Sequence, residues 1–111
     1  MSWEIIFYQT SSGKRVVEDF IDNLDTAAKS KTVRQIELLG TYGVELGMPH
    51  AKLLGGGLFE LRVRGKREVR VFYVYVAAKR IILLHGFVKK SQATPKKELD
   101  IARKRQQEVS S

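Results

Sequence analysis

The chain has 111 residues, 43% of them apolar, a formal net charge of +8 and no cysteine. Without cysteine, disulfides, zinc–thiolate sites and thiol nucleophiles are excluded. No apolar run approaches the length of a membrane-spanning helix, and the N-terminus lacks the basic segment of a secretory signal, so we expect a cytoplasmic protein with one domain over residues 1–111. Residues 1–49 carry five Lys or Arg against seven Asp or Glu, whereas residues 50–111 carry fifteen against five, which indicates a polyanionic partner.

The N-terminal half predicts one strand and two helices. Residues 3–8 form a short apolar run that is typical of a strand. Asp25 is a candidate N-cap of a second helix running toward Tyr42, and Gly40 weakens the prediction of its last turn. Before it, an apolar stripe at helical spacing predicts a first helix, with the residues Val16, Val17, Phe20, Ile21 and Leu24.

The C-terminal half predicts three strands and a last helix. Residues 43–57 contain five of the nine glycines and are interpreted as a loop. Thr94 followed by Pro95 predicts the start of a helix over about residues 95–108. Short turns separate the expected strands, which cover residues 58–64, 69–76 and 80–88. We therefore expect an α+β fold of order β-α-α-β-β-β-α, with a small antiparallel sheet packed by two N-terminal helices and a C-terminal helix.

Basic residues on the expected sheet are the main functional signal. Arg62 and Arg64 alternate with apolar residues in one strand, and Arg70 lies in the next, where an arginine among apolar residues needs a partner. Lys89 and Lys90 follow at the end of the last expected strand. If Arg70 shares the face of Arg62, one surface holds four or five cations within reach of a single phosphodiester. The alternative is that these cations, Arg64 above all, are solvated and serve solubility.

Other residues have both a chemical and a structural interpretation. His85 is either a general base or a hydrogen-bonded structural residue. Tyr73 either stacks on nucleobases or belongs to the core. Two histidines without cysteine or a carboxylate cluster do not predict a metal site. The further candidates for RNA contacts are Lys52, Arg64, Tyr73 and Lys97.

Several short blocks, taken together, resemble one protein family. The chain is similar over residues 3–105 to the RelE/ParE toxin superfamily, and within it to the HigB-like branch, which includes phage-derived relatives. The blocks are Leu58-Phe59-Glu60-Leu61-Arg62, Arg70-Val71-Phe72-Tyr73, Gly86-Phe87-Val88-Lys89-Lys90, and Thr94-Pro95 leading into residues 98–105. The fold of that family has the order of elements expected above.

The resemblance implies a toxin of a bacterial toxin–antitoxin pair that cuts messenger RNA in the ribosomal A site without a metal or other cofactor. Carried over by position, the family's active-site cations are Arg62, Arg70 and Lys90, with Lys89 beside it. The chain departs from some relatives at Leu99, where they have tyrosine, and at Glu60, where they have lysine.

This chemistry needs few groups from the protein, since RNA supplies its own 2′-hydroxyl nucleophile. We expect Arg62 and Arg70 to clamp the phosphate, because a guanidinium matches its geometry. A lysine with a lowered pKa, Glu60 or His85 could act as base, and Lys90 could instead protonate the leaving oxygen. Arg70→Ala is predicted to abolish growth arrest and to leave the fold intact.

The sequence is also compatible with two other functions. A ParE-like toxin would poison DNA gyrase and leave messenger RNA whole. A non-catalytic RNA-binding module would bind RNA with a steep salt dependence and cut nothing. For the toxin, the expected partners are messenger RNA on the ribosome and an antitoxin of the helix-turn-helix type, with DNA contacted only through the toxin–antitoxin complex and no membrane involved.

Overall fold

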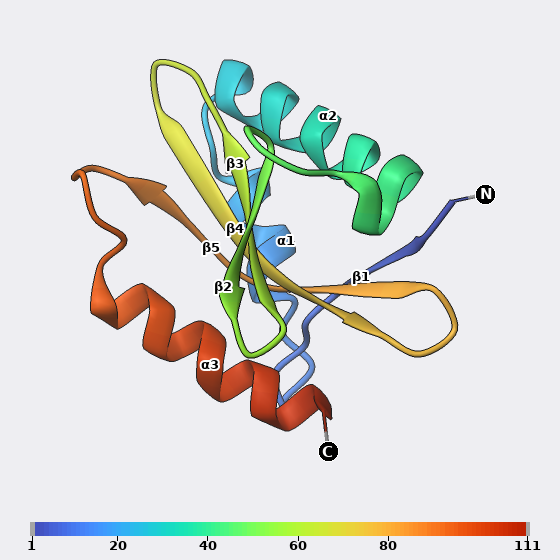
Figure 1. Ribbon diagram of the computed structural model, residues 1–111. Helices are drawn as coiled ribbons and strands as arrows, with labels where there is room; N and C mark the ends of the chain where they lie inside the picture. Colours follow the sequence, from blue (N-terminus) through green and yellow to red (C-terminus); the bar gives the residue numbers. More distant parts are fainter. Residues whose placement is uncertain (1, 111) are drawn as a thin grey trace.

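The computed structural model of the chain describes residues 2–110. Its centre is a five-stranded sheet with the spatial order β1-β5-β4-β3-β2 (Figure 1). The strands are β1 (Glu4–Phe7), β2 (Ala51–Gly55), β3 (Leu58–Val63), β4 (Glu68–Val76) and β5 (Arg80–Lys89). The helices are α1 (Val16–Asp22), α2 (Thr26–Tyr42) and α3 (Lys96–Ser110), with a 3-10 turn at Gly43–Glu45 after α2.

The sheet differs from the small antiparallel sheet predicted from the sequence. β1 pairs in parallel with β5, where Ile5 lies opposite Ile81, so the sheet is mixed. β2 lies inside the segment 43–57 that was predicted as a loop, which adds a fifth strand to the expected order β-α-α-β-β-β-α. β2 is short, and its pairing register shifts between Leu53 and Gly55. Its sequence has no clear alternation of polar and apolar residues, which is the pattern that predicts a strand and its register.

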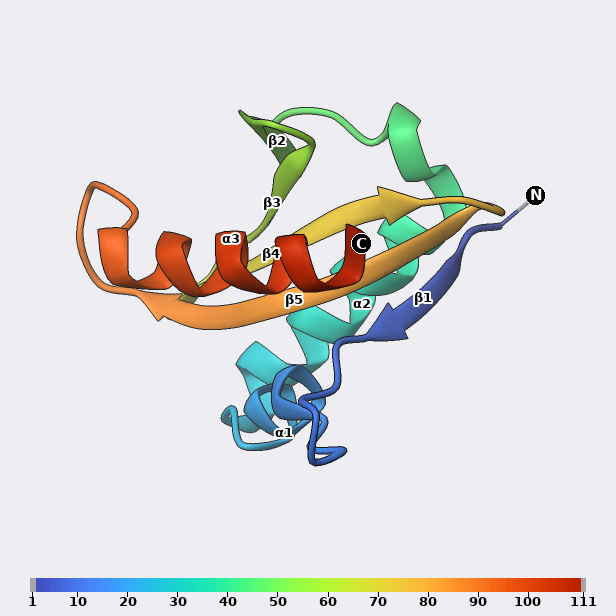
Figure 2. The ribbon, with the colours of Figure 1, turned by 90° about the horizontal axis from the view of Figure 1, so that it is seen from below.

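The helices divide between the two faces of the sheet (Figure 1). α1 and α2 cover one face, and α3 lies along β5 and β4 on the other (Figure 2). The first core contains residues of α1, α2 and the strands, among them Val17, Ile21, Ile36, Leu39, Leu61, Val71 and Leu83. The second core, under α3, contains Leu58, Phe72, Leu84, Phe87 and Ala102. Because both faces are covered, β3 and β4 carry buried side chains on both sides.

The helix boundaries follow local signals in the sequence. Asp25 is the N-cap of α2 as predicted, and its carboxylate accepts a hydrogen bond of 2.9 Å from the backbone N–H of Ala28. α2 continues through Gly40, which is buried and whose carbonyl oxygen accepts a 2.7 Å hydrogen bond from the backbone N–H of Trp3. Among residues 2–110, no helix has the length and apolar character needed to cross a bilayer.

Gly86 is a position where β5 and α1 are too close for a side chain. A β-carbon there would stand 2.7 Å from Cδ2 of Phe20. Gly86→Ala is therefore expected to destabilise the protein by about 1–3 kcal/mol through overpacking. Urea unfolding measures the effect, and Gly47→Ala is the control because no atom lies within 4 Å of the added carbon. Equal stabilities for the two variants would contradict this packing.

Candidate nucleic-acid interface

Arg62 and Arg70 lie side by side on the face of the sheet that carries α3. They are directly opposite each other in the β3–β4 register, and opposed residues of antiparallel strands project to the same side. Phe72, two residues after Arg70, belongs to the core under α3. From the sequence, the two arginines could be placed together only if Arg70 shared the face of Arg62. The structure shows that they do share this face.

The carboxylate of Glu60 lies between these two arginines. Its Oε1 atom is 3.3 Å from Nε of Arg62 and 3.8 Å from Nε of Arg70. Its Oε2 atom accepts a hydrogen bond of 3.1 Å from the hydroxyl group of Thr94. Glu60 is only 2% exposed, so these partners replace water in stabilising its charge. One buried anion therefore connects β3, β4 and the segment that leads into α3.

Arg70 is buried and held by other residues. It is 3% exposed, its Nη2 atom lies 2.9 Å from a carboxylate oxygen of Glu68, and its Nη1 atom donates to the carbonyl oxygen of Val69 at 3.3 Å. This placement differs from the phosphate clamp expected for Arg70, because a covered guanidinium between two carboxylates is not free to grip a ligand. Arg62, whose side chain is 17% exposed, is the arginine of this pair that a ligand can reach.

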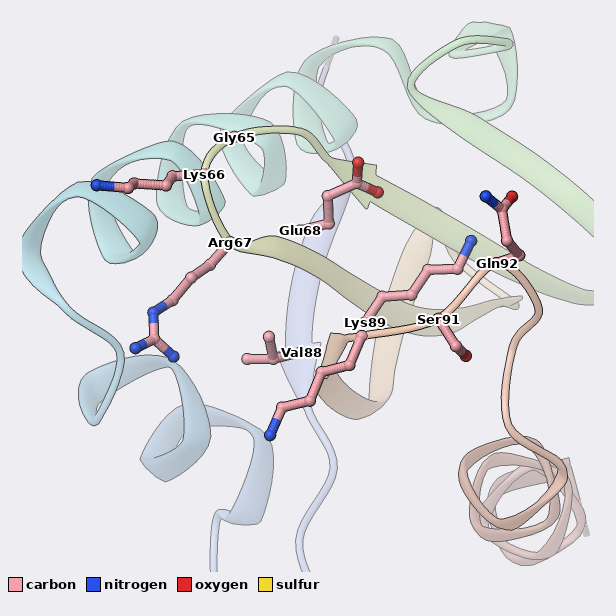
Figure 3. Close-up of a pocket in the computed structure, with 9 residues that line it drawn as sticks. Gly65, Lys66, Arg67, Glu68, Val88, Lys89, Ser91 and Gln92 are labelled. Atoms are coloured by element: carbon pink, nitrogen blue, oxygen red, sulfur yellow. The ribbon is translucent and has the colours of Figure 1, made fainter.

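A groove with a volume of about 590 Å³ adjoins this cluster, and Figure 3 shows it between the β3–β4 turn and the end of β5. Glu68, the partner of Arg70, forms part of its wall and lies opposite Lys89 in the β4–β5 register. The complete lining is Gly65, Lys66, Arg67, Glu68, Val88, Lys89, Lys90, Ser91 and Gln92. Its lining has four cations and one carboxylate, and within residues 2–110 only Arg67 of the four is paired with a carboxylate outside the groove, that of Asp25. The groove therefore has a positive potential that favours an anionic ligand.

Lys89 and Lys90 are the groove cations available to a ligand near the arginine pair. Lys89 is half-buried at the end of β5, and Lys90 follows it and is exposed. Within residues 2–110, neither ammonium group forms an ion pair or a hydrogen bond. Their charge is therefore not neutralised by the protein itself.

The other predicted RNA contacts are scattered. Lys52 lies opposite Glu60 across β2 and β3, Arg64 follows β3, and Lys97 lies in the first turn of α3. All three are exposed, and none of them lines the groove.

The prediction that Tyr73 stacks on nucleobases is wrong. The side chain is fully buried on the opposite face of the sheet, in the core beneath α1 and α2. Its ring stacks on that of Phe59, with centroids 5.5 Å apart, and burial raises the pKa of its hydroxyl group. Phe72 and Tyr73 point to opposite faces because side chains alternate along a strand.

His85 joins β5 to α3. Its Nε2 atom lies 2.7 Å from a carboxylate oxygen of Glu98, and its Nδ1 atom lies 3.4 Å from Nη1 of Arg105. Because arginine can only donate, this arrangement assigns the proton of a neutral imidazole to Nε2. Burial lowers the pKa of His85, and the charge of Arg105 lowers it further, whereas the contact with Glu98 opposes them. Both ring nitrogens are occupied by residues of α3. His85 therefore connects β5 to α3 and is not free to act as a base.

The lowered pKa of His85 predicts a pH dependence of stability. As the pH falls through about 6.5, the unfolded chain gains a proton at His85 that the folded chain does not bind. The free energy of unfolding is therefore expected to fall with pH here, and to level off below the folded-state pKa. Urea unfolding across this range, compared with His85→Gln, isolates the contribution. An identical pH dependence in both proteins would rule out a neutral, half-buried His85.

The roles of Glu68 and Thr94 were not predicted from the sequence. Glu68 precedes Arg70 by two residues, as Glu60 precedes Arg62, so each carboxylate shares a face with its arginine. This spacing of two residues along a strand could have indicated both ion pairs. Thr94 was predicted only as a helix cap, and its hydroxyl group binds Glu60 instead.

The family of the chain follows from a comparison with family models. Residues 19–107 match the family described as Phage derived protein Gp49-like (DUF891), and this match includes α2, every strand except β1, the arginine pair and the groove. No curated protein matches the sequence significantly. The chain belongs to the Gp49-like family of phage-derived proteins, a RelE/toxin-like family.

Proposed function

We propose that this protein is the toxin of a type II toxin–antitoxin pair, of the HigB-like branch, and that it cuts messenger RNA on the ribosome. The observation that supports this proposal best is the contact of Arg62 with the buried carboxylate of Glu60, next to a groove whose lysines have no partners in residues 2–110. Membership of a RelE/toxin-like family favours the same conclusion.

The proposed reaction is attack by the 2′-hydroxyl group of RNA on the adjacent phosphate. Arg62 and Lys89 bind the phosphate oxygens and offset the negative charge that develops in the transition state. Arg70 is a positioning residue, because it reaches the ligand only through Glu60 and Glu68. The products would carry a 2′,3′-cyclic phosphate and a 5′-hydroxyl group.

Glu60 and Lys90 are the proposed proton-transfer groups. When Arg62 turns to a phosphate, it leaves Oε1 of Glu60, to which it is bound at 3.3 Å, and this oxygen can then accept the proton of the 2′-hydroxyl group. Lys90 is exposed in the groove wall and donates a proton to the leaving 5′-oxygen. His85 does not take this role, because Glu98 and Arg105 of α3 hold its two ring nitrogens and none of these three residues lines the groove.

The proposed partners follow from the same chemistry. The basic groove suits the RNA backbone, and messenger RNA in the ribosomal A site is the proposed substrate. The proposed inhibitor is an antitoxin of the helix-turn-helix type, which would connect the toxin to DNA only through their complex.

The test is to express the chain alone, follow growth and map the ends of messenger RNA. We expect growth arrest, together with fragments that begin with a 5′-hydroxyl group and end in a 2′,3′-cyclic phosphate. Fragments with 5′-phosphate ends would exclude attack by the 2′-hydroxyl group. Arrest with intact messenger RNA and broken DNA would favour the gyrase poison, and RNA binding without cleavage or arrest would favour a non-catalytic module.

A further inference from the structure

A second hollow lies on the other side of the β3–β4 turn. Its volume is about 410 Å³, and it is lined by Asp25, Ala27, Ala28, Lys31, Gly65, Lys66 and Arg67. It lies between the first turns of α2 and the turn that forms a wall of the groove. The two elements are close here, because the Nζ atom of Lys31 is 2.9 Å from the place where a β-carbon of Gly65 would stand.

The β3–β4 turn separates this hollow from the groove beside the arginine pair. Gly65, Lys66 and Arg67 line both spaces. Figure 3 shows that the side chains of Lys66 and Arg67 leave the turn toward the helices, away from Gln92 at the far wall of the groove. A ligand in the groove can therefore continue over the turn and meet cations on its other side.

Two of the three cations in the second hollow are free to bind a ligand. Arg67 is paired with Asp25, whose carboxylate lies 3.2 Å away and also caps the N–H of Ala28. Lys31 and Lys66 are exposed and form no ion pair or hydrogen bond within residues 2–110. The single carboxylate of the hollow is thus already neutralised, while two ammonium groups from different elements are not.

We propose that this hollow binds a second phosphate of the RNA strand held in the groove, with Lys31 and Lys66 as its ligands. The identity of the ligand as RNA rests on the proposed function, whereas the site itself rests on the two free lysines and the shared turn. Contacts of this kind add affinity and fix the path of the strand, and they do not select a base sequence. The RNA strand would cross the β3–β4 turn from the side of β5 to the side of α2.

The salt dependence of RNA binding tests this site without requiring cleavage. The probe is a short fluorescein-labelled oligouridine, measured by anisotropy between about 50 and 200 mM KCl. Each phosphate contact contributes about 0.7 to the slope of log affinity against log salt for single strands. We expect Lys31→Gln and Lys66→Gln each to lower the slope by up to about 0.7, and the double variant to lower it most.

The matched control is Lys79→Gln, which removes the same charge from the β4–β5 turn at the opposite end of β4. It is expected to leave the slope unchanged. A wild-type slope in the double variant, an equal loss in the control, or no binding of the probe by the wild-type protein would each overturn the proposal. Cleavage is measured separately, by mapping RNA ends on ribosomes. An absence of cleavage would contradict the proposed nuclease activity but not the second phosphate site, and an unchanged salt slope would contradict the site but not the nuclease activity.

Discussion

Arg62→Gln is expected to abolish growth arrest and to lower the rate of messenger RNA cleavage by a factor of about 10² to 10³. Loss of one preorganised charge contact to the transition state has this size of effect. Arg62 is the partly exposed arginine of the pair, and its neighbour Arg70 is too buried to replace it. Quantitative mapping of RNA ends on ribosomes, with purified protein, gives the rate.

The control for this experiment is Arg34→Gln. Arg34 is exposed on α2, so the variant has the same net charge as Arg62→Gln and retains the arginine pair. It should cut at the wild-type rate. Full cleavage by a folded Arg62→Gln protein would contradict the assignment of Arg62 to the phosphate.

Arg70→Met is expected to lower the free energy of unfolding by up to about 3 kcal/mol, the lower end of the cost of breaking a buried ion pair. Without Arg70, the buried carboxylate of Glu60 keeps only Arg62 as a cationic partner, so its charge is compensated less completely. This differs from the expectation that an Arg70 variant keeps its fold intact, which rested on a phosphate-binding role. Urea unfolding measures the loss.

A double-mutant cycle separates the ion pair from general packing. In Glu60→Gln with Arg70→Met, no charge is left unpaired at the position of Glu60, and an amide oxygen still accepts from Thr94. Most of the stability lost in Arg70→Met should therefore return. Additive losses in the double variant would show that the 3.8 Å contact between Glu60 and Arg70 contributes little.

Local patterns in the sequence predict those features of the fold that depend on neighbouring residues. The alternation of arginine with apolar residues around Arg62 correctly predicted that Leu61 and Val63 face the core beneath α1 and α2, and Asp25 correctly predicted the start of α2. These signals depend on neighbours in the chain. The position of Arg62 opposite Arg70 depends on the register between β3 and β4, which the structure shows and local patterns do not.

Other features depend on long-range pairing or on charge balance. The parallel pairing of β1 with β5 joins segments far apart in the chain. The arginines were expected as an excess of positive charge, but Glu60 and Glu68 neutralise them, so the free charge of the interface lies on the lysines of the groove. Residues 43–57 were interpreted as a loop, although Gly56 and Gly57, two glycines with positive φ, are what a tight hairpin connection needs.

α3 also contacts the tip of the β2–β3 hairpin at Gly56. Arg103 donates to the carbonyl oxygen of Gly55 at 2.8 Å, and Gln106 donates to that of Gly56 at 2.6 Å. Exposed tips of this kind normally tolerate epitope tags or inserted residues. Here an insertion would displace both acceptors and loosen the helix from the sheet, so reporter sequences are better placed elsewhere.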